Sequence, residues 1–567
     1  MTGPSDGARR ALALLLALVA LSAALALHQA FLAPWSLAPA PFAIQDDARQ
    51  FLAWMPRLTG APVVPGDILS DYWQDVAPKP YALLYALAAR LGAEPVLVHR
   101  LLPLPLLAAA AVFGFRIALR LTGAPWPAFV AAAFLMAFLV HEDSIFSATP
   151  RAFSMPLFLA FLDSFQRGRS PAAVAALAAL AAIYPTTALV GLGILGLARV
   201  RLRPRPAIDL SRGALFELGS AAGAILAAAL LLGPAASAWG PTLRLAEAPD
   251  LPNLMRPEGR STLTDASGAI GWICNQRMGL VPEVVPCWPE LPWAPVPNIL
   301  FLLPLLGLAA GAARGSARFN PEGRNGLYLL ALLSCLAWYA VATAAAFDLH
   351  LPSRYTQRIL GPLEWLAIGQ VVGLSLQGLS RRRGGRLPPA AALALGGVLL
   401  ALFSTPLPGY QRPADPAAMR HLLETPPGTR VAGLSADLDF VPALTGRPVF
   451  ATVEHAIPFH RGYGGAMERR LGLSLAALSS PDPAAPAAFL ELTGVDLLLL
   501  DRALLERGRL SPRYAGVVPW EAAAAEARFR AGGAALQRVW RGCALPGTGP
   551  VVILEAGCLR GRLEALP

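Results

Sequence analysis

The stretch LYLLALLSCLAWYAVATAAAF, at residues 327–347, contains no charged side chain. As an α-helix it would rise about 1.5 Å per residue, which is enough to cross the roughly 30 Å hydrocarbon core of a bilayer. Two further apolar runs cover residues 11–27 and 214–232, and only Glu217 interrupts the second. Runs of this length predict a mainly α fold in which the chain crosses the membrane many times.

The composition of the whole chain agrees with this prediction. Of its 567 residues, 55% are hydrophobic and 15% are charged, and the mean hydropathy is +0.51. Soluble domains carry about 25% charged residues. The net charge of +11 comes almost entirely from arginine, which lies mainly in short segments between apolar runs. This is the positive-inside pattern of membrane proteins, so we expect the lipid bilayer as a partner and no nucleic acid.

Loops rich in arginine alternate along the chain with loops that are not, and this alternation predicts about eleven spans with a cytoplasmic N-terminus. Arg9 and Arg10 precede the run 11–27, which we interpret as an uncleaved first span and not as a signal peptide. The run 171–200 has basic segments at both ends, so it should pass the membrane twice, as two short helices broken at Tyr184-Pro185. The inferred inside segments together contain 18 arginines.

Three long segments are then expected on the outer face. Two are loops, at residues 28–96 and 235–296, within a transmembrane domain that covers residues 1–405. The third is an extracytoplasmic α/β domain at residues 406–567, because the composition changes there to that of a soluble protein. Its apolar runs predict strands at 430–434, 448–453, 495–500 and 551–554, and helices at 484–492 and 521–530.

Four of the five cysteines fall in these outer segments, and the fifth, Cys335, lies in a span. An even number of cysteines in an oxidising compartment predicts disulfides, and four cysteines allow three connectivities. We favour Cys274–Cys287, which closes a short loop. Cys543–Cys558 is then the remaining pair, although a simple hairpin at residues 546–549 would not place these two cysteines opposite each other.

Charged residues at a membrane boundary are candidates for function. The densest group is in the first outer loop, where Asp46 and Asp47 are followed by Arg49. One carboxylate can face a cleft while the other caps the following helix, where an acid is favourable. The alternative is that both acids have only a structural role, in which Asp46 caps the helix and Asp47 pairs with Arg49. Amphipathic helices are expected at 50–58 and 81–91, on the membrane surface.

This first loop, with its acidic pair and two surface helices, resembles the GT-C superfamily of membrane glycosyltransferases, which use polyprenyl-phosphate sugars. The stretches 45–50 and 71–74, followed by Ala77-Pro78, are also similar to those of bacterial membrane proteins with the same layout. The resemblance implies a bacterial inner-membrane protein in which a first-loop acid deprotonates the acceptor hydroxyl. We expect Asp46 or Asp47 in this role, with Asp46 slightly favoured.

The resemblance also implies roles for residues of other outer segments. Glu142 and Asp143, in the second outer loop, could bind Mg²⁺ or Mn²⁺, or could form only a polar turn. The donor phosphate requires cations, for which the candidates are arginines near the outer helix ends: Arg49, Arg151, Arg354 and Arg358. Each could instead face lipid headgroups. We interpret Glu454-His455 and His460-Arg461 as packing or surface residues.

The predicted function is sugar transfer, with inversion, from a polyprenyl-phosphate donor to a lipid, glycan or protein acceptor on the outer face. The sequence has no cytoplasmic domain for a nucleotide sugar, which favours a lipid-linked donor. Two alternatives are a transporter or flippase of lipid-linked glycans and a non-catalytic membrane scaffold. The clustering of the acids on one face favours the enzyme over transport.

Overall fold

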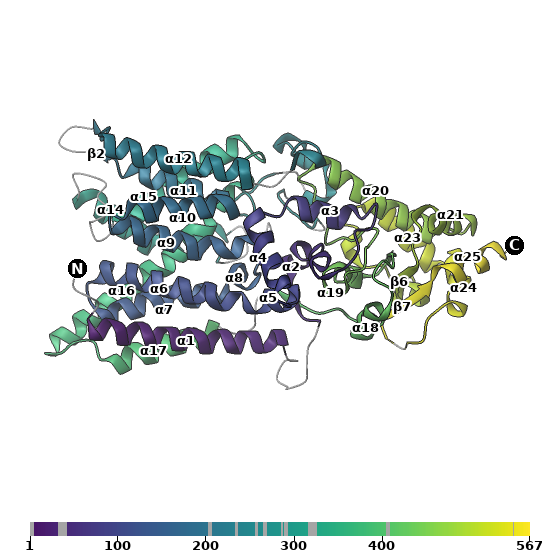
Figure 1. Ribbon diagram of the computed structural model, residues 1–567, viewed down its shortest axis with the longest axis horizontal. Helices are drawn as coiled ribbons and strands as arrows, with labels where there is room; N and C mark the ends of the chain where they lie inside the picture. The colour runs from purple at the N-terminus through teal and green to yellow at the C-terminus, as the bar shows by residue number, and fades with distance from the viewer. Residues whose placement is uncertain are drawn as a thin grey trace.

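The computed structural model describes residues 5–31, 42–201, 207–232, 236–255, 259–264, 269–284, 287, 293–315, 326–403, 409–547 and 549–566. Parts of the predicted outer loops 28–96 and 235–296, and the predicted boundary at 405/406, lie outside these residues. Figure 1 shows a bundle of long helices at one end of the molecule and an α/β region at the other. The N-terminus is at the far end of the bundle, and the C-terminus is at the opposite end of the molecule.

The bundle consists of apolar helices in the positions of the predicted spans. Its helices are α1 (Asp6–Phe31), α5 (Pro95–Leu101), α6 (Pro103–Thr122), α7 (Pro125–His141), α9 (Ser154–Gln166), α10 (Ser170–Ile183), α11 (Pro185–Leu197), α12 (Arg212–Leu232), α13 (Pro295–Phe301), α14 (Leu303–Gly315), α15 (Gly326–Ala344), α16 (Gln357–Arg382) and α17 (Pro389–Phe403). The short strands β2 (Val200–Arg201) and β3 (Ala207–Ile208) pair between α11 and α12.

By length and composition, five helical segments of the described chain can cross a membrane, or six if the bent pair α13 and α14 forms one span. Helices α7, α10, α11 and α17 are shorter apolar helices. The protein is therefore a multi-pass membrane protein, and the count of eleven spans stays a prediction. The predicted helix break is present, since α10 ends at Ile183 and α11 begins at Pro185.

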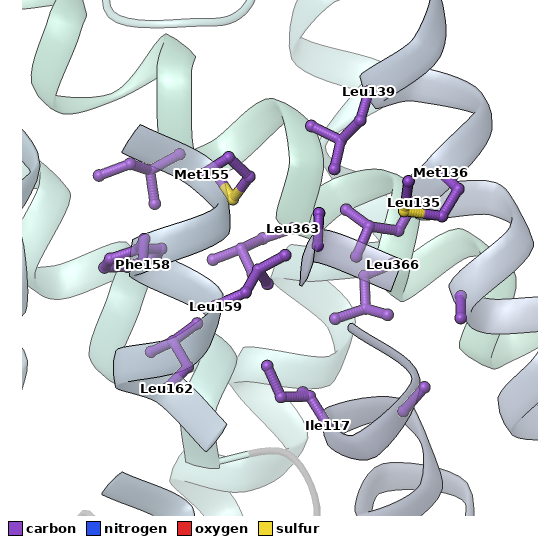
Figure 2. Close-up of a cluster of buried hydrophobic side chains, with 14 of the residues drawn as sticks. Ile117, Leu135, Met136, Leu139, Met155, Phe158, Leu159, Leu162, Leu363 and Leu366 are labelled. Carbon is purple, nitrogen blue, oxygen red and sulfur yellow. The ribbon is translucent and has the colours of Figure 1, made fainter. Parts of the chain in front are cut away.

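Leucine, methionine and phenylalanine side chains from several helices form the core of the bundle. Figure 2 shows side chains of α6, α7, α9 and α16 pointing toward one another, among them Ile117, Leu135, Leu159 and Leu363. All four are fully buried. Helices α7 and α16 run at the centre of this core and pack closely against each other.

A layer of short helices lies between the bundle and the α/β region (Figure 1). It includes α2 (Asp46–Phe51), η1 (Met55–Thr59), α3 (Ile68–Asp75), α4 (Lys79–Arg90), α8 (Asp143–Phe146) and η2 (Pro150–Phe153). The middle loop, defined here as the described residues between 236 and 287, adds η3 (Ala236–Trp239), η4 (Leu245–Asp250) and η5 (Pro252–Leu254). The segment η6 (Pro352–Tyr355) directly precedes α16.

The C-terminal α/β region is built on a three-stranded sheet in the order β5-β6-β7. Strand β5 (Val431–Leu434) is parallel to β6 (Leu497–Asp501), with Val431 opposite Leu497, and β7 (Val551–Glu555) is antiparallel to β6. The helices around it are α18 (Pro416–Glu424), η7 (Ala436–Asp439), α19 (Val441–Thr445), α20 (Arg461–Leu478), α21 (Ala484–Thr493), α22 (Arg502–Arg507), η8 (Pro512–Tyr514), α23 (Pro519–Arg530), α24 (Ala535–Val539), η9 (Trp540–Gly542) and α25 (Ala556–Glu564).

Most of the predicted elements of this region are present, but the predicted strand 448–453 is not. Only Val449 makes an isolated parallel bridge, to Val431. After this bridge the chain turns away from the sheet, where the Thr452 hydroxyl bonds to the His455 ring and the Glu454 amide donates to the Asp439 carboxylate. This turn brings Glu454 to the first loop.

The first loop and the C-terminal region form one hydrophobic core, although the predicted domain boundary separates them in sequence. Trp54, Leu69 and Tyr72 of the first loop lie in the same buried cluster as Val431 and Leu499. The short strands β1 (Ile44–Gln45) and β4 (Tyr410–Gln411) also pair antiparallel, with Ile44 opposite Gln411. These contacts fix the start of α2 against the C-terminal region.

The structure joins Cys274 to Cys287 and Cys543 to Cys558. The second pair does not depend on a simple hairpin. Cys543 precedes the bridge between Ala544 and Leu554, and Cys558 lies in the first turn of α25, which brings the two Cα atoms to 5.6 Å.

Replacing both Cys543 and Cys558 by serine should lower the stability of the C-terminal region. A crosslink that closes a 15-residue loop contributes about 3 kcal/mol, mainly by restricting the unfolded chain. The measurement is thermal unfolding of the full chain followed by tryptophan fluorescence, since Trp540 lies beside this crosslink in sequence. An unchanged melting temperature would contradict the prediction.

Candidate functional site

A cavity of about 460 Å³ lies where α2, the middle loop and the C-terminal region meet. Most of its lining side chains are charged or polar. They are Asp46, Asp47, Arg49, Gln50, Arg260, Ser261, Arg277, Gln411, Glu454 and Arg513, together with Ile457 and Phe459. Both acids of the predicted first-loop site therefore face the same cavity.

The first turn of α2 places these acids. The N-cap of α2 is Gln45, whose side chain accepts a hydrogen bond from the Ala48 amide. Asp46 is therefore not the cap, and its carboxylate is available to the cavity. Arg49 pairs with Asp46, three residues before it, and not with Asp47. The alternative interpretation, with Asp46 as the cap and Asp47 paired to Arg49, is thus wrong in both parts.

Asp46 lies at the edge of the cavity, with 39% of its side chain exposed. Besides Arg49, it accepts a hydrogen bond of 3.3 Å from the Gln411 side chain. Partial burial raises the pKa of Asp46, and the nearby negative charge of Glu454 raises it further. A carboxylate with a raised pKa is a better proton acceptor than one fully neutralised by cations.

Asp47 begins a chain of ion pairs that contains most of the other predicted residues. Arg151 Nη2 lies 2.7 Å from Asp47 Oδ2 and 2.7 Å from Asp143 Oδ2. Arg358 pairs with Glu142 and lies 3.8 Å from Asp143. Residues from the first loop, the second loop and the start of α16 are therefore in direct contact.

The same ion pairs bear on the predicted metal site. Glu142 and Asp143 each contact a guanidinium group, and these cations would repel a divalent metal ion. Arg151 and Arg358 lower the pKa of Asp143, outweighing the opposite effect of burial. As arranged, the pair does not fit an Mg²⁺ or Mn²⁺ site, and the metal stays an untested prediction.

Two arginines near these linked ion pairs form no ion pair of their own among the described residues, although the charge of Asp47 acts on both. They are Arg354, in η6, and Arg277, in the middle loop. Burial, and then the positive charge of Arg354, lower the pKa of Arg277 to about 9, so Arg277 remains cationic at neutral pH. Two cations that repel each other beside a cavity would be stabilised by an anionic ligand.

The backbone around Arg277 is held firmly. The Asn275 side chain accepts a hydrogen bond of 2.8 Å from the Arg277 amide, and Gln357 of α16 donates to the Asn275 carbonyl at 2.7 Å. The Ser353 hydroxyl donates to the Gln276 carbonyl at 2.9 Å. These contacts fix Arg277 relative to the helix that carries Arg358.

Four charged residues of the cavity were not predicted as site residues: Arg260, Arg277, Glu454 and Arg513. Glu454 was interpreted as a packing or surface residue, but its side chain is only 3% exposed and contacts Arg49 at 3.1 Å. No local sequence signal separates Arg260, Arg277 and Arg513 from the many other arginines of the chain. His455 is buried in packing, and Arg461 pairs with Glu247 at the surface.

The sequence matches no protein-family model and no curated protein. Among solved structures, the chain is similar to the oligosaccharyltransferase AglB from Archaeoglobus fulgidus in complex with an inhibitory peptide and a dolichol-phosphate. The TM-score is 0.47 and the identity 11%, over 89% of this chain and 72% of that one. It is also similar to the arabinofuranosyltransferase AftD from mycobacteria, with a TM-score of 0.49 and 15% identity over 98% of this chain. The chain spans 40% of the length of that structure.

Proposed function

We propose that this protein is a membrane glycosyltransferase that moves a sugar from a polyprenyl-phosphate donor to an acceptor hydroxyl. The acceptor is a lipid, glycan or protein on the outer face of the bacterial cytoplasmic membrane. The observation that carries this proposal is the cavity, in which the first-loop acids and the unpaired Arg277 lie together at one end of the apolar bundle. A lipid-linked phosphate sugar combines the apolar and anionic groups that such a site would bind.

In the proposed reaction, Asp46 accepts the proton of the acceptor hydroxyl as its oxygen attacks the anomeric carbon. The bond between that carbon and the phosphate oxygen breaks, and the lipid phosphate leaves with the bonding electrons. Direct displacement inverts the anomeric configuration. Arg277 and Arg354 stabilise the negative charge that develops on the phosphate. Each acid contacts an arginine, and Asp46 is the more suitable base because burial, and then the charge of Glu454, raise its pKa.

The transporter and scaffold alternatives have less support. A transporter binds its substrate near the middle of the membrane, between helices. Here the acids and arginines of the cavity come from loops and from the C-terminal region. A scaffold would have no need for two buried cations that form no ion pair among the described residues, since such charges destabilise a fold unless a ligand compensates them.

The phosphate role can be tested with Arg277→Gln in the purified full chain and decaprenyl phosphate, a polyprenyl phosphate without sugar, as the probe. A hydrogen bond to a charged group contributes about 1.5–3 kcal/mol, so we expect Kd to rise roughly 10- to 100-fold. The control is Arg530→Gln, at a side chain that is 68% exposed on α23. Unchanged binding by Arg277→Gln would contradict the phosphate role.

A further inference from the structure

Glu454 lies at the junction of three segments that are far apart in sequence. Gln50 of α2 donates a 2.6 Å hydrogen bond to its Oε1, and Arg49 lies 3.1 Å from its Oε2. Arg513 of the C-terminal region approaches Oε2 to 3.0 Å, and Arg260 of the middle loop pairs with Oε1. A single buried carboxylate thus holds the first loop, the middle loop and the C-terminal region together.

These contacts hold the second half of α2, whose start is fixed by the pairing of β1 with β4. A helix of six residues is not stable on its own, so its position depends on tertiary contacts. Both Arg49 and Gln50, in its second half, are held by Glu454. The same nitrogen of Arg49, Nη2, contacts Glu454 and Asp46. Arg49 Nη1 also lies 3.9 Å from Asp439 Oδ2, so the Arg49 charge is shared among three carboxylates.

We propose that Glu454 is a positioning residue for Asp46, which fixes α2 in the cavity wall and keeps Arg49 from fully neutralising the Asp46 carboxylate. This inference rests on the proposed function, in which Asp46 is the base. Glu454 itself is not suited to accept a proton. Burial would raise its pKa, but Arg260, Arg49 and Arg513 together lower the pKa of Glu454 to about 2.

The charges that face Asp46 come from every segment around it. Arg49 and Asp47 belong to α2, Arg260 to the middle loop, and Glu454 and Arg513 to the C-terminal region. The negative charge of Glu454 raises the pKa of Asp46, after the larger effect of burial. Without that charge, Arg49 is shared only between Asp46 and Asp439, and the pKa of Asp46 falls.

The test compares Glu454→Gln with wild type in two measurements on the full chain. Hydrogen exchange of residues 46–51 should become at least about tenfold faster, since α2 loses its anchor. The rate of sugar transfer in native-host membranes should fall, and the acidic limb of its pH profile should move to lower pH. The control is Glu526→Gln, which removes only a surface ion pair within α23 and should change neither measurement.

The two measurements separate this inference from the proposed function. Unchanged exchange and an unchanged pH profile in Glu454→Gln would overturn the positioning role. If exchange in α2 becomes faster but sugar transfer does not depend on Asp46, Glu454 still anchors α2. Asp46 is then not the base, and the effect of the anchor on catalysis is rejected as well. Lower activity with unchanged exchange and an unmoved pH profile would also overturn the inference, because it would indicate an effect outside α2.

Discussion

Asp46→Asn should lower sugar transfer by about 100- to 10,000-fold, the usual contribution of a general base. Asparagine has nearly the same size as aspartate but cannot accept the proton of an attacking hydroxyl. Its amide can still accept the hydrogen bond from Gln411. The chain should therefore fold normally, and the loss should appear in kcat more than in KM.

Asp47→Asn should have a smaller effect through Arg151. The variant leaves Arg151 held by Asp143 and the Ser147 hydroxyl, so the guanidinium can shift away from the cavity. Both variants can be measured by surface-glycan analysis of a native host in which the variant gene replaces the wild-type gene. The control is Asp482→Asn, at an exposed loop before α21. Full glycosylation in both Asp46→Asn and Asp47→Asn would reject the proposed function.

The second large effect concerns the packing of α16 against α7. A Cβ atom at Gly373 would lie 2.7 Å from the Pro127 carbonyl oxygen and 3.0 Å from the Pro127 Cα. A Cβ atom at Gly369 would lie 2.7 Å from the Ala131 Cα. These neighbours are backbone atoms, which cannot rotate away. Gly369 and Gly373 form a GxxxG motif, the spacing that allows membrane helices to approach closely.

Replacing Gly369 and Gly373 together by alanine should therefore separate the two central helices of the bundle. Overpacking costs about 1–3 kcal/mol per site, so we expect a large drop in melting temperature and in the yield of monodisperse protein after detergent extraction. The matched control is Gly378→Ala on the same helix, where a Cβ would have no atom within 4 Å. That variant should be neutral or slightly stabilising, because alanine favours helix. Equal behaviour of the two variants would contradict this account.

The sequence predicted the elements whose signal is local. The apolar runs predicted the helices of the bundle, and the basic flanks together with Pro185 predicted the break between α10 and α11. Strands β5, β6 and β7 also follow from apolar runs. The strand expected at 448–453 is reduced to a bridge at Val449, after which the Thr452 hydroxyl bonds to His455 and the Glu454 amide donates to Asp439, contacts that periodicity cannot reveal.

The candidate site was predictable only in part. Asp46 and Asp47 were found because an acidic pair at a membrane boundary is costly and therefore informative. Their partners were not found, because ion pairs between residues hundreds of positions apart leave no pattern in a single sequence. Glu454 lies 405 residues from Arg49, and Arg260 lies 194 residues from Glu454.

The membrane class, the helix positions and the acidic first loop were thus determined by the sequence itself, since burial in lipid constrains composition directly. The tertiary structure decided which groups share the cavity. It gave the cap of α2 to Gln45, paired Asp47 with Arg151, and left Arg277 without an ion pair in the described part of the chain. The physical reason is that the preference of a side chain for lipid depends on that residue itself, whereas electrostatic pairing depends on distances that only the folded chain defines.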